Sequence, residues 1–245
     1  MYEMKINGVD IESFNARLLS FNVSGTKFSN NCNVNDNRLY LPKLYSRTYQ
    51  QKTLTVTLTF KGTGRTVFDR LSSLRKSTSA FDKAVFADEL LISLPDSFVY
   101  RAVCQSIGDL TPDGDGIADV TYTFSVLQCL PLVSKTIYNG RHKINNEGNV
   151  ECDCIIEATN NTDVAQLLNF RSFGFKYSPL QPGETLVING FDNTLTVSGV
   201  NVFNNFTSFI EFPRLHPGSF EFYTSCYIAD PQAITIKVSF YPTFL

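Results

Sequence analysis

Residues 51–60 read Gln51-Lys52-Thr53-Leu54-Thr55-Val56-Thr57-Leu58-Thr59-Phe60. Threonines and apolar residues alternate without a break in this stretch, so an extended chain puts every apolar side chain on one face. That face consists of Leu54, Val56, Leu58 and Phe60. The alternation and the many β-branched residues predict a half-buried strand. A mainly β fold is therefore the starting expectation for the chain.

A helix is expected directly after this strand. The Gly62-Thr63-Gly64 break ends the alternation, and apolar residues then recur three or four positions apart. The apolar positions are Val67, Phe68, Leu71 and Leu74, and the basic residues on the other side are Arg70, Arg75 and Lys76. The spacing predicts a short helix with its apolar stripe against the core and its basic residues exposed.

More strands are expected on both sides of this segment. β-Branched and aromatic residues predict strands at about 89–94, 97–106 and 118–128. Upstream, residues 16–24 and 38–49 are strand-like and flank the polar stretch 29–37, whose Asn, Ser and Asp residues favour turns. Together these segments predict a long projecting hairpin.

The carboxy-terminal half has a purely β pattern. Short runs separated by Gly, Pro, Asn or Asp lie at 184–188, 194–198, 206–212, 219–224 and 233–241. In the last run Ile234, Ile236, Val238 and Phe240 are expected to face inward. Strands at this spacing predict a β-sandwich. A polar run, 139–143, follows Leu130-Pro131-Leu132 and indicates a boundary there between domains 1–132 and 133–245.

The composition excludes some classes of function. The chain has 245 residues, with 21 Lys and Arg against 23 Asp and Glu, and no basic stripe of the kind that neutralises nucleic-acid phosphates. No apolar run approaches the roughly 20 residues that span a bilayer, and the first residues lack the apolar stretch of a signal peptide. The six cysteines are therefore expected to stay reduced. Neither sequence-specific nucleic-acid binding nor membrane insertion is expected.

The second half resembles the galectin-like carboxy-terminal domain of siphophage distal tail proteins. The resemblance rests on an ordered series: Pro182-Gly183-Glu184-Thr185-Leu186-Val187-Ile188-Asn189-Gly190, Leu195-Thr196-Val197, Phe212-Pro213-Arg214-Leu215-His216-Pro217-Gly218 and Tyr241-Pro242-Thr243-Phe244-Leu245. The first half is similar to the ring-forming domain of that family in the order of its parts, from Ile6-Asn7-Gly8 through the hairpin, the Thr-alternating strand, the helix and the paired strands at 89–106. The fold class expected is thus all-β with one short helix: a sandwich or barrel-like ring domain followed by a galectin-like sandwich.

The resemblance implies a structural, non-enzymatic role in the virion, at the tip or baseplate of a phage tail, after assembly in the cytoplasm of the host bacterium. Six copies would form a ring that joins the tail tube protein to the hub, or tail-associated lysin-type, protein. DNA would pass through the channel without specific binding, and the second domains would radiate outward and hold receptor-binding proteins. No cofactor is implied.

The hairpin suits a head-to-tail ring contact, because a polar tip with apolar flanks can clasp a neighbouring subunit. The residues expected in that contact are Phe28, Leu39, Tyr40, Leu41, Leu44 and Tyr45. The alternative is that they belong to the core of their own subunit.

One segment has the composition of a calcium loop. Asp113, Asp115 and Asp119 are clustered around glycines, and such carboxylates can wrap Ca²⁺. As an EF-hand the loop fails, because Tyr122 stands at position twelve in place of the bidentate Glu. The competing interpretation is a hairpin turn, which Asp-Gly pairs favour.

No catalytic signature is present. His142 and His216 lie in turn-like contexts without a nearby nucleophile, and the set they form with Cys152 and Cys154 has no known zinc spacing. The main alternative function is a carbohydrate-binding module that recognises host cell-wall glycans, although the chain has no Trp to stack on a sugar. A metal-dependent hydrolase is a third possibility.

Overall fold

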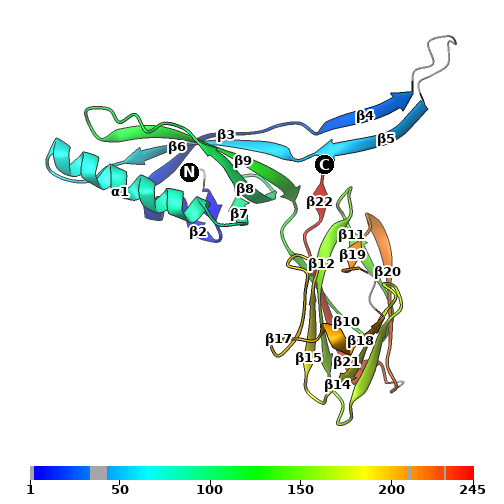
Figure 1. The fold of residues 1–245 in the computed structure, drawn as a ribbon. Helices are drawn as coiled ribbons and strands as arrows, with labels where there is room; N and C mark the ends of the chain where they lie inside the picture. The colour runs from blue at the N-terminus through cyan, green and yellow to red at the C-terminus, as the bar shows by residue number, and fades with distance from the viewer. Residues whose placement is uncertain (1–2, 34–42, 209–210, 229) are drawn as a thin grey trace. The chain divides into compact units, whose positions relative to one another are not determined.

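The computed structural model describes residues 3–33, 43–208, 211–228 and 230–245, with the backbone alone for residues 27–28, 30–33 and 43–49. The chain forms two compact units, Met1–Cys129 with Leu245, and Leu130–Phe244 (Figure 1). The fold class predicted from the sequence, mainly β with one α-helix among the described residues, is confirmed.

The first unit is built on an antiparallel sheet in the order β2-β1-β7-β8-β9-β6-β3. Its strands are β1 (Lys5–Ile6), β2 (Val9–Asp10), β3 (Ala16–Val23), β6 (Lys52–Lys61), β7 (Leu90–Ser93), β8 (Val99–Ile107) and β9 (Ile117–Cys129). Helix α1 (Val67–Val85) lies across one face of this sheet, and a short 3-10 helix, η1 (Ile11–Phe14), precedes β3 (Figure 1). The strands expected at 51–60, 89–94, 97–106 and 118–128 are all present.

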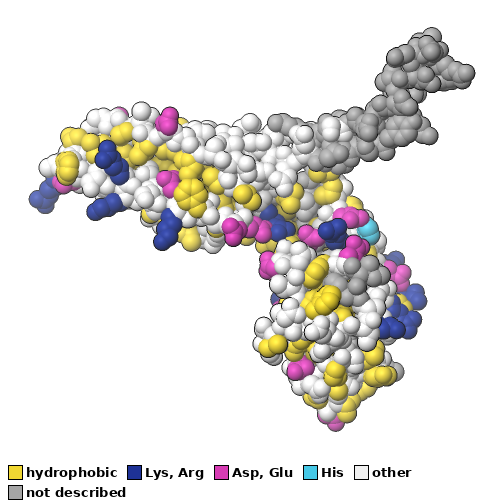
Figure 2. Space-filling model, viewed as in Figure 1, with side chains coloured by type: hydrophobic (Ala, Val, Ile, Leu, Met, Phe, Trp, Pro, Cys, Tyr) yellow, Lys and Arg dark blue, Asp and Glu magenta, His cyan; other side chains and the backbone are white. Residues whose placement is uncertain are grey.

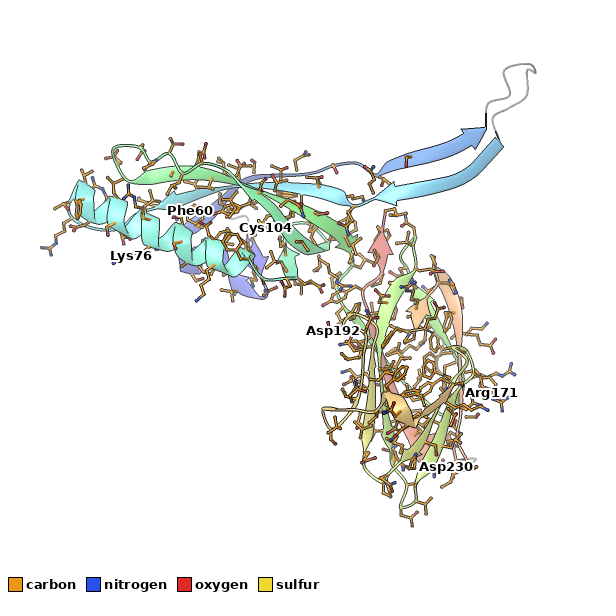
Figure 3. The ribbon with its side chains drawn as sticks, in the orientation of Figure 1. Phe60, Lys76, Cys104, Arg171, Asp192 and Asp230 are labelled. Carbon is orange, nitrogen blue, oxygen red and sulfur yellow. The ribbon has the colours of Figure 1, made fainter. Side chains whose placement is uncertain are left out.

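Strand β6 has the two faces that its alternation predicts. Its neighbours are β9 on one side and β3 on the other. The apolar side chains at 54, 56, 58 and 60 are fully buried. Phe60 packs against Phe81 of α1, with ring centroids 5.6 Å apart, while Lys76 lies on the outer side of the helix (Figure 3). Alternation in the sequence therefore located the sheet face that α1 covers.

The predicted helix is present, but the prediction of its buried stripe is wrong in the first turn. Leu74 is buried, whereas Phe68 is 80% exposed and Val67 is exposed as well. The buried stripe continues through Ser77, Thr78, Phe81 and Val85. Ser77 and Thr78 conceal this stripe in the sequence. They are tolerated inside because the Ser77 hydroxyl accepts a hydrogen bond from Asn15 and the Thr78 hydroxyl donates to the Leu74 carbonyl.

The hairpin has different strands from those expected. Strand β4 (Lys27–Asn33) pairs with β5 (Lys43–Gln50) in a separate two-stranded sheet, and the expected partner at 16–24 instead forms β3 and pairs with β6. Residues 29–33, expected in a turn, thus belong to a strand. Antiparallel pairing uses main-chain N–H and C=O groups, which Asn and Ser supply as well as apolar residues do. The rest of the expected turn, 34–42, lies outside the described residues.

The second unit is a sandwich of two antiparallel sheets. One sheet has the order β10-β21-β12-β15-β16-β17, with β19 beside β12, and the other has the order β11-β20-β13-β14-β18. The first comprises β10 (Val133–Tyr138), β12 (Cys152–Asn160), β15 (Thr185–Asn189), β16 (Thr194–Val197), β17 (Val200–Asn201), β19 (Arg214–Leu215) and β21 (Ile234–Phe240). The second comprises β11 (Gly140–Asn146), β13 (Gln166–Phe170), β14 (Phe175–Leu180), β18 (Phe206–Ser208) and β20 (Gly218–Ser225). Two 3-10 turns, η2 (Phe203–Asn205) and η3 (Pro231–Ala233), and the terminal β22 (Thr243–Phe244) complete the elements.

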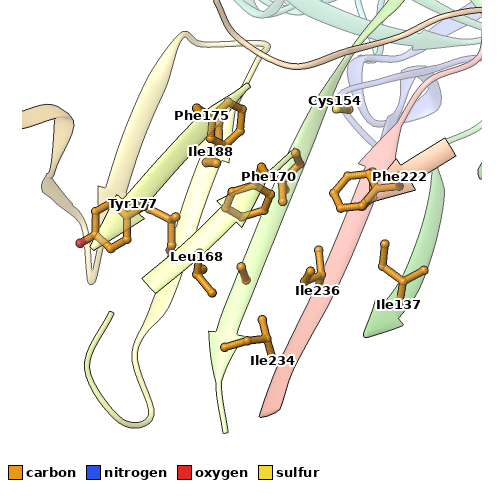
Figure 4. Packing of buried hydrophobic residues seen from close by; sticks show 14 of the residues in the cluster. Ile137, Cys154, Leu168, Phe170, Phe175, Tyr177, Ile188, Phe222, Ile234 and Ile236 are labelled. Carbon is orange, nitrogen blue, oxygen red and sulfur yellow. The ribbon is translucent and has the colours of Figure 1, made fainter. Parts of the chain in front are cut away.

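The sandwich core lies between the two sheets. Ile234 and Ile236 of β21 face Phe170 and Phe222 of the other sheet, and all four side chains are buried (Figure 4). The inward set predicted for 233–241 is thereby confirmed. Ser239 of the same strand is buried as well, and its hydroxyl is satisfied by a hydrogen bond shared with that of Ser134 at 2.8 Å.

Five strands between residues 133 and 180 were not predicted. The polar run at 139–143, expected to mark a boundary, lies largely in β11. β11 belongs to one sheet of a sandwich, so only one of its faces is buried, and Arg141 and Lys143 point to solvent while Ile144 points inward. Polar residues on the solvent face hide such a strand from a search for apolar runs.

Candidate assembly surfaces

The β4–β5 hairpin holds three of the six residues expected in subunit contact. Phe28 lies in β4, and Leu44 and Tyr45 lie in β5. The register pairs Phe28 with Tyr49 and Leu44 with Cys32. The other three expected residues, 39–41, lie outside the described part of the chain. The backbone thus forms a two-stranded arm, and the contact itself stays a prediction.

The outer face of α1 is a second candidate surface. Phe68 and Phe86 are 80% and 70% exposed, and their positions differ by 18 residues, which is five turns of an α-helix. Both aromatic side chains therefore leave the helix in the same direction. Arg75 and Lys83 lie on the same stripe between them, and Figure 2 shows apolar and basic side chains together over α1. We call this set, Phe68, Arg75, Lys83 and Phe86, the outer stripe.

A shallow groove of about 690 Å³ runs along the outer stripe. Leu71 and Ala80 add apolar surface to it, and Lys76 adds a third positive charge. Soluble monomers seldom expose such large apolar side chains in a row, and exposed aromatic and basic residues together are typical of protein contacts. This surface was not predicted from the sequence, because Phe68 was assigned to the core. The apolar stripe that continues through Phe81 and Val85 is the feature of the sequence that places Phe68 on the outer side.

Close backbone packing fixes α1 on the sheet. A Cβ atom at Gly62 would lie 1.9 Å from the carbonyl oxygen of Arg70, so only glycine allows the helix to come this near to the end of β6. The Gly62 N–H donates to the Gly116 carbonyl at 2.8 Å, and the Arg70 Nε donates to the Asp115 carbonyl at 3.0 Å. The first turns of α1, the end of β6 and the loop before β9 therefore form one rigid corner.

The Asp113–Asp119 segment belongs to this corner and has the geometry of a turn. The Asp113 carboxylate accepts hydrogen bonds from the backbone N–H groups of Asp115 and Ile117, at 2.9 and 2.8 Å. Asp119 lies on β9, where its carboxylate accepts a hydrogen bond from Thr59. The Asp115 carboxylate is exposed and lies 3.8 Å from Arg70 Nη2. The described residues contain no group of three or more His, Cys, Asp or Glu that could hold a metal. The geometry of the segment is that of the competing hairpin-turn interpretation, and calcium binding by Asp113, Asp115 and Asp119 stays a prediction.

The cysteines and histidines of the second unit are not brought together as a site. Cys152 and Cys154 share the buried face of β12, as their spacing predicts, and burial raises the pKa of the Cys154 thiol, which keeps it protonated. His216 is exposed and its Nδ1 lies 2.6 Å from Glu151 Oε1. His142 lies within β11 rather than in the turn expected for it.

Among the described helices, none is both long and apolar enough to cross a membrane.

Solved structures of phage hub and baseplate proteins have a similar fold. The chain superposes on the crystal structure of the SPP1 Dit (gp 19.1) protein with a TM-score of 0.65 at 15% identity, over 100% of both chains. It is also similar to a chain in each of two activated phage P2 baseplate structures, one with Ca and one with Sr, with TM-scores of 0.60, identities of 10% and 11%, and 98% coverage of both chains. No family model and no curated protein sequence matches.

Proposed function

We propose that the chain is a distal tail protein: a non-enzymatic structural subunit at the tip of a bacteriophage tail. The observation that carries this proposal is likeness over the whole length of the chain, because both units and their order are shared with the SPP1 Dit protein. That protein is described as a paradigm of the hub adsorption apparatus in phages that infect Gram-positive bacteria. The chain would accordingly reside in the virion, after assembly in the host cytoplasm.

In this proposal residues 1–132 form a hexameric ring and residues 133–245 form the galectin-like domains around it. Tail tube protein and hub protein bind opposite sides of the ring, DNA passes through its channel, and the second domains carry receptor-binding proteins. Such a ring forms through one head-to-tail contact that is repeated between all neighbouring copies. It closes when the six rotations from each copy to the next return to the first copy. The β4–β5 arm, with Phe28, Leu44 and Tyr45, supplies one side of that contact. The predicted contact residues Leu39, Tyr40 and Leu41 lie outside the described part of the chain.

The outer stripe of α1 is the second contact proposed for the ring, with a neighbouring copy of this chain as its occupant. Exposed Phe68 and Phe86 give it apolar area, and the basic residues between them give it positive charge. The first unit has acidic residues outside α1, among them the exposed Glu3 before β1 and Glu12 in η1, which offer a neighbour the opposite charge.

Negative-stain microscopy of the purified chain tests the proposal. Rings with a central opening are expected at micromolar concentration, and added tail tube protein should bind one side of them. A particle that stays monomeric at high concentration, and that also turns over a substrate, would contradict both the ring and the structural role.

A further inference from the structure

One face of the second unit is strongly cationic. The five-stranded sheet turns Arg141 and Lys143 of β11, Arg171 after β13 and Lys176 of β14 to solvent. Glu221 of β20 is the one acidic residue on β11, β20, β13 and β14. Figure 2 shows basic side chains gathered at this edge of the unit, and Figure 3 labels Arg171 there. We call these four basic residues the cationic face.

The charge of this face is opposite to that of the unit that carries it. Residues 130–244 contain seven Lys and Arg against ten Asp and Glu, so four of the seven positive charges lie on one face of a net acidic unit. On the other sheet two of the three basic residues have acidic partners, whereas on the cationic face Arg141 alone has an ion pair among the described residues. Arg214 lies 3.1 Å from Asp153, and Lys237 lies 2.7 Å from Glu157. Such segregation raises the local concentration of anions at the cationic face.

Two of the arginines are held in place by one tyrosine. The guanidinium carbons of Arg141 and Arg171 lie 4.6 and 5.1 Å from the centre of the Tyr223 ring. Arg141 lies in β11 and Arg171 directly follows β13, and these two strands lie on either side of β20, which holds Tyr223. The Arg171 Nε also donates to the Ser225 hydroxyl at 3.3 Å. The two positive charges are therefore oriented before any ligand arrives, which lowers the entropy lost on binding.

We propose that the cationic face binds a polyanion whose repeating charges are phosphodiesters. Guanidinium groups match phosphate oxygens through paired N–H donors, and several separate cations along one sheet suit a polymer with spaced charges. A neutral sugar fits poorly, because the arginines occupy the aromatic ring on which a pyranose would stack. A protein partner fits poorly too, since the outward residues of β11 and β20 are polar or charged except Tyr223.

Among phosphodiester polymers the face favours a flexible chain of polyol or sugar phosphates over duplex DNA. Duplex DNA carries dense phosphates that proteins usually engage with about six to ten cations, and the cationic face has four. Glu221, whose carboxylate lies 3.2 Å from Arg141, would also repel a rigid, closely charged rod. Binding of this kind needs the second unit alone and is independent of ring assembly.

The test is fluorescence anisotropy of labelled poly(glycerol phosphate) titrated with the full-length chain at several salt concentrations. Binding is expected, and it should weaken as salt rises because counterions compete for the phosphates. Hyaluronate, duplex DNA and dextran serve as carboxylate, rigid phosphodiester and neutral comparisons. Each should bind at least about tenfold more weakly, which corresponds to about 1.4 kcal/mol.

Three variants separate this site from general charge effects. Replacing Arg141 and Arg171 together by Ala should weaken binding about tenfold or more and reduce the salt slope. Arg214→Ala removes the same charge from the other sheet and should leave binding unchanged. Glu221→Gln removes the one carboxylate of the face and should tighten binding, a result that a purely structural role for Glu221 does not predict.

Three results would overturn the proposal: no binding of poly(glycerol phosphate), equal weakening by Arg214→Ala and by the double variant, or equal affinity for hyaluronate or duplex DNA. The melting temperature of each variant shows whether a loss of binding reflects unfolding. The altered side chains are exposed, so changes of only a few degrees are expected.

Discussion

At the scale of single residues, Phe81 and Phe68 show how differently one helix uses the same side chain. Phe81 is fully buried and lies edge to face with Phe14, Phe60 and Tyr122, at centroid distances of 5.4, 5.6 and 4.9 Å. Phe68 stands on the opposite side of α1 and is mostly in solvent. Helical period in the sequence pointed to Phe68 and not to Phe81, and the tertiary structure shows that Phe81 is the one in the core.

Phe81→Ala should lower the free energy of unfolding by about 3–5 kcal/mol, because it removes a buried ring and leaves a cavity. Phe68→Ala is its matched control and should change that energy by about 0.5 kcal/mol or less. Urea denaturation of dilute protein measures both. Similar losses in the two variants would mean that the buried stripe of α1 is misassigned.

Gly62 is required by close packing. Gly62→Ala should destabilise the first unit by about 1–3 kcal/mol, because its new methyl group overlaps the backbone of Arg70 and neither segment can move freely. Gly25→Ala has open space around its new Cβ atom and should be close to neutral. Thermal melts of the two variants give the comparison, and equal melting temperatures would show that the corner is not rigid.

Tyr122 makes the first unit sensitive to alkaline pH. Burial, and then the hydrogen bond to Asp82, raise the pKa of the Tyr122 hydroxyl above its ordinary value of about 10. Above that pH the unfolded chain loses a proton that the folded chain retains, so stability is complete below pH 10 and falls as the pH rises further. The melting temperature of Tyr122→Phe should decline less steeply between pH 9.5 and 11 than that of the wild type. Tyr138→Phe, at an exposed position, should follow the wild type.

At the scale of elements, α1 has one buried face and one exposed face. Its start is set by a capping box, in which Thr66 accepts from the Asp69 N–H at 3.1 Å and Asp69 accepts from the Thr66 N–H at 3.2 Å. The inner stripe then packs on β6, and the outer stripe is the second contact proposed for the ring.

Phe68→Glu should therefore leave the monomer folded and shift the ring toward monomers by at least about tenfold, because a charge would enter an apolar contact. Val200→Glu, at an exposed position of the second unit, is the control and should assemble normally. Analytical ultracentrifugation reports the distribution of species. Normal rings of Phe68→Glu would exclude the outer stripe as a subunit contact.

At the scale of the whole molecule, the chain joins a sheet-and-helix unit with a separate arm to a sandwich. Replacing residues 27–50 by a short Gly-Asn-Gly turn removes β4 and β5 but leaves every strand of the main sheet in place. The melting temperature should change little, because the arm forms a sheet of its own. Native mass spectrometry should show monomers in place of hexamers. Hexamers of the armless chain would contradict the ring contact proposed for the arm.

The sequence by itself determined the mainly β class, the strand at 52–61, the presence of α1 and the inward face of 234–240, because period and turn residues are local signals. The tertiary structure alone decided which side of α1 is buried, that β3 pairs with β6, and that the polar run at 139–143 lies largely in an edge strand. It also gathered Arg141, Lys143, Arg171 and Lys176 on one face from three separate segments. Strand pairing, and the choice of the buried side where polar residues interrupt the pattern, depend on residues far apart in the chain, so a local pattern does not decide them.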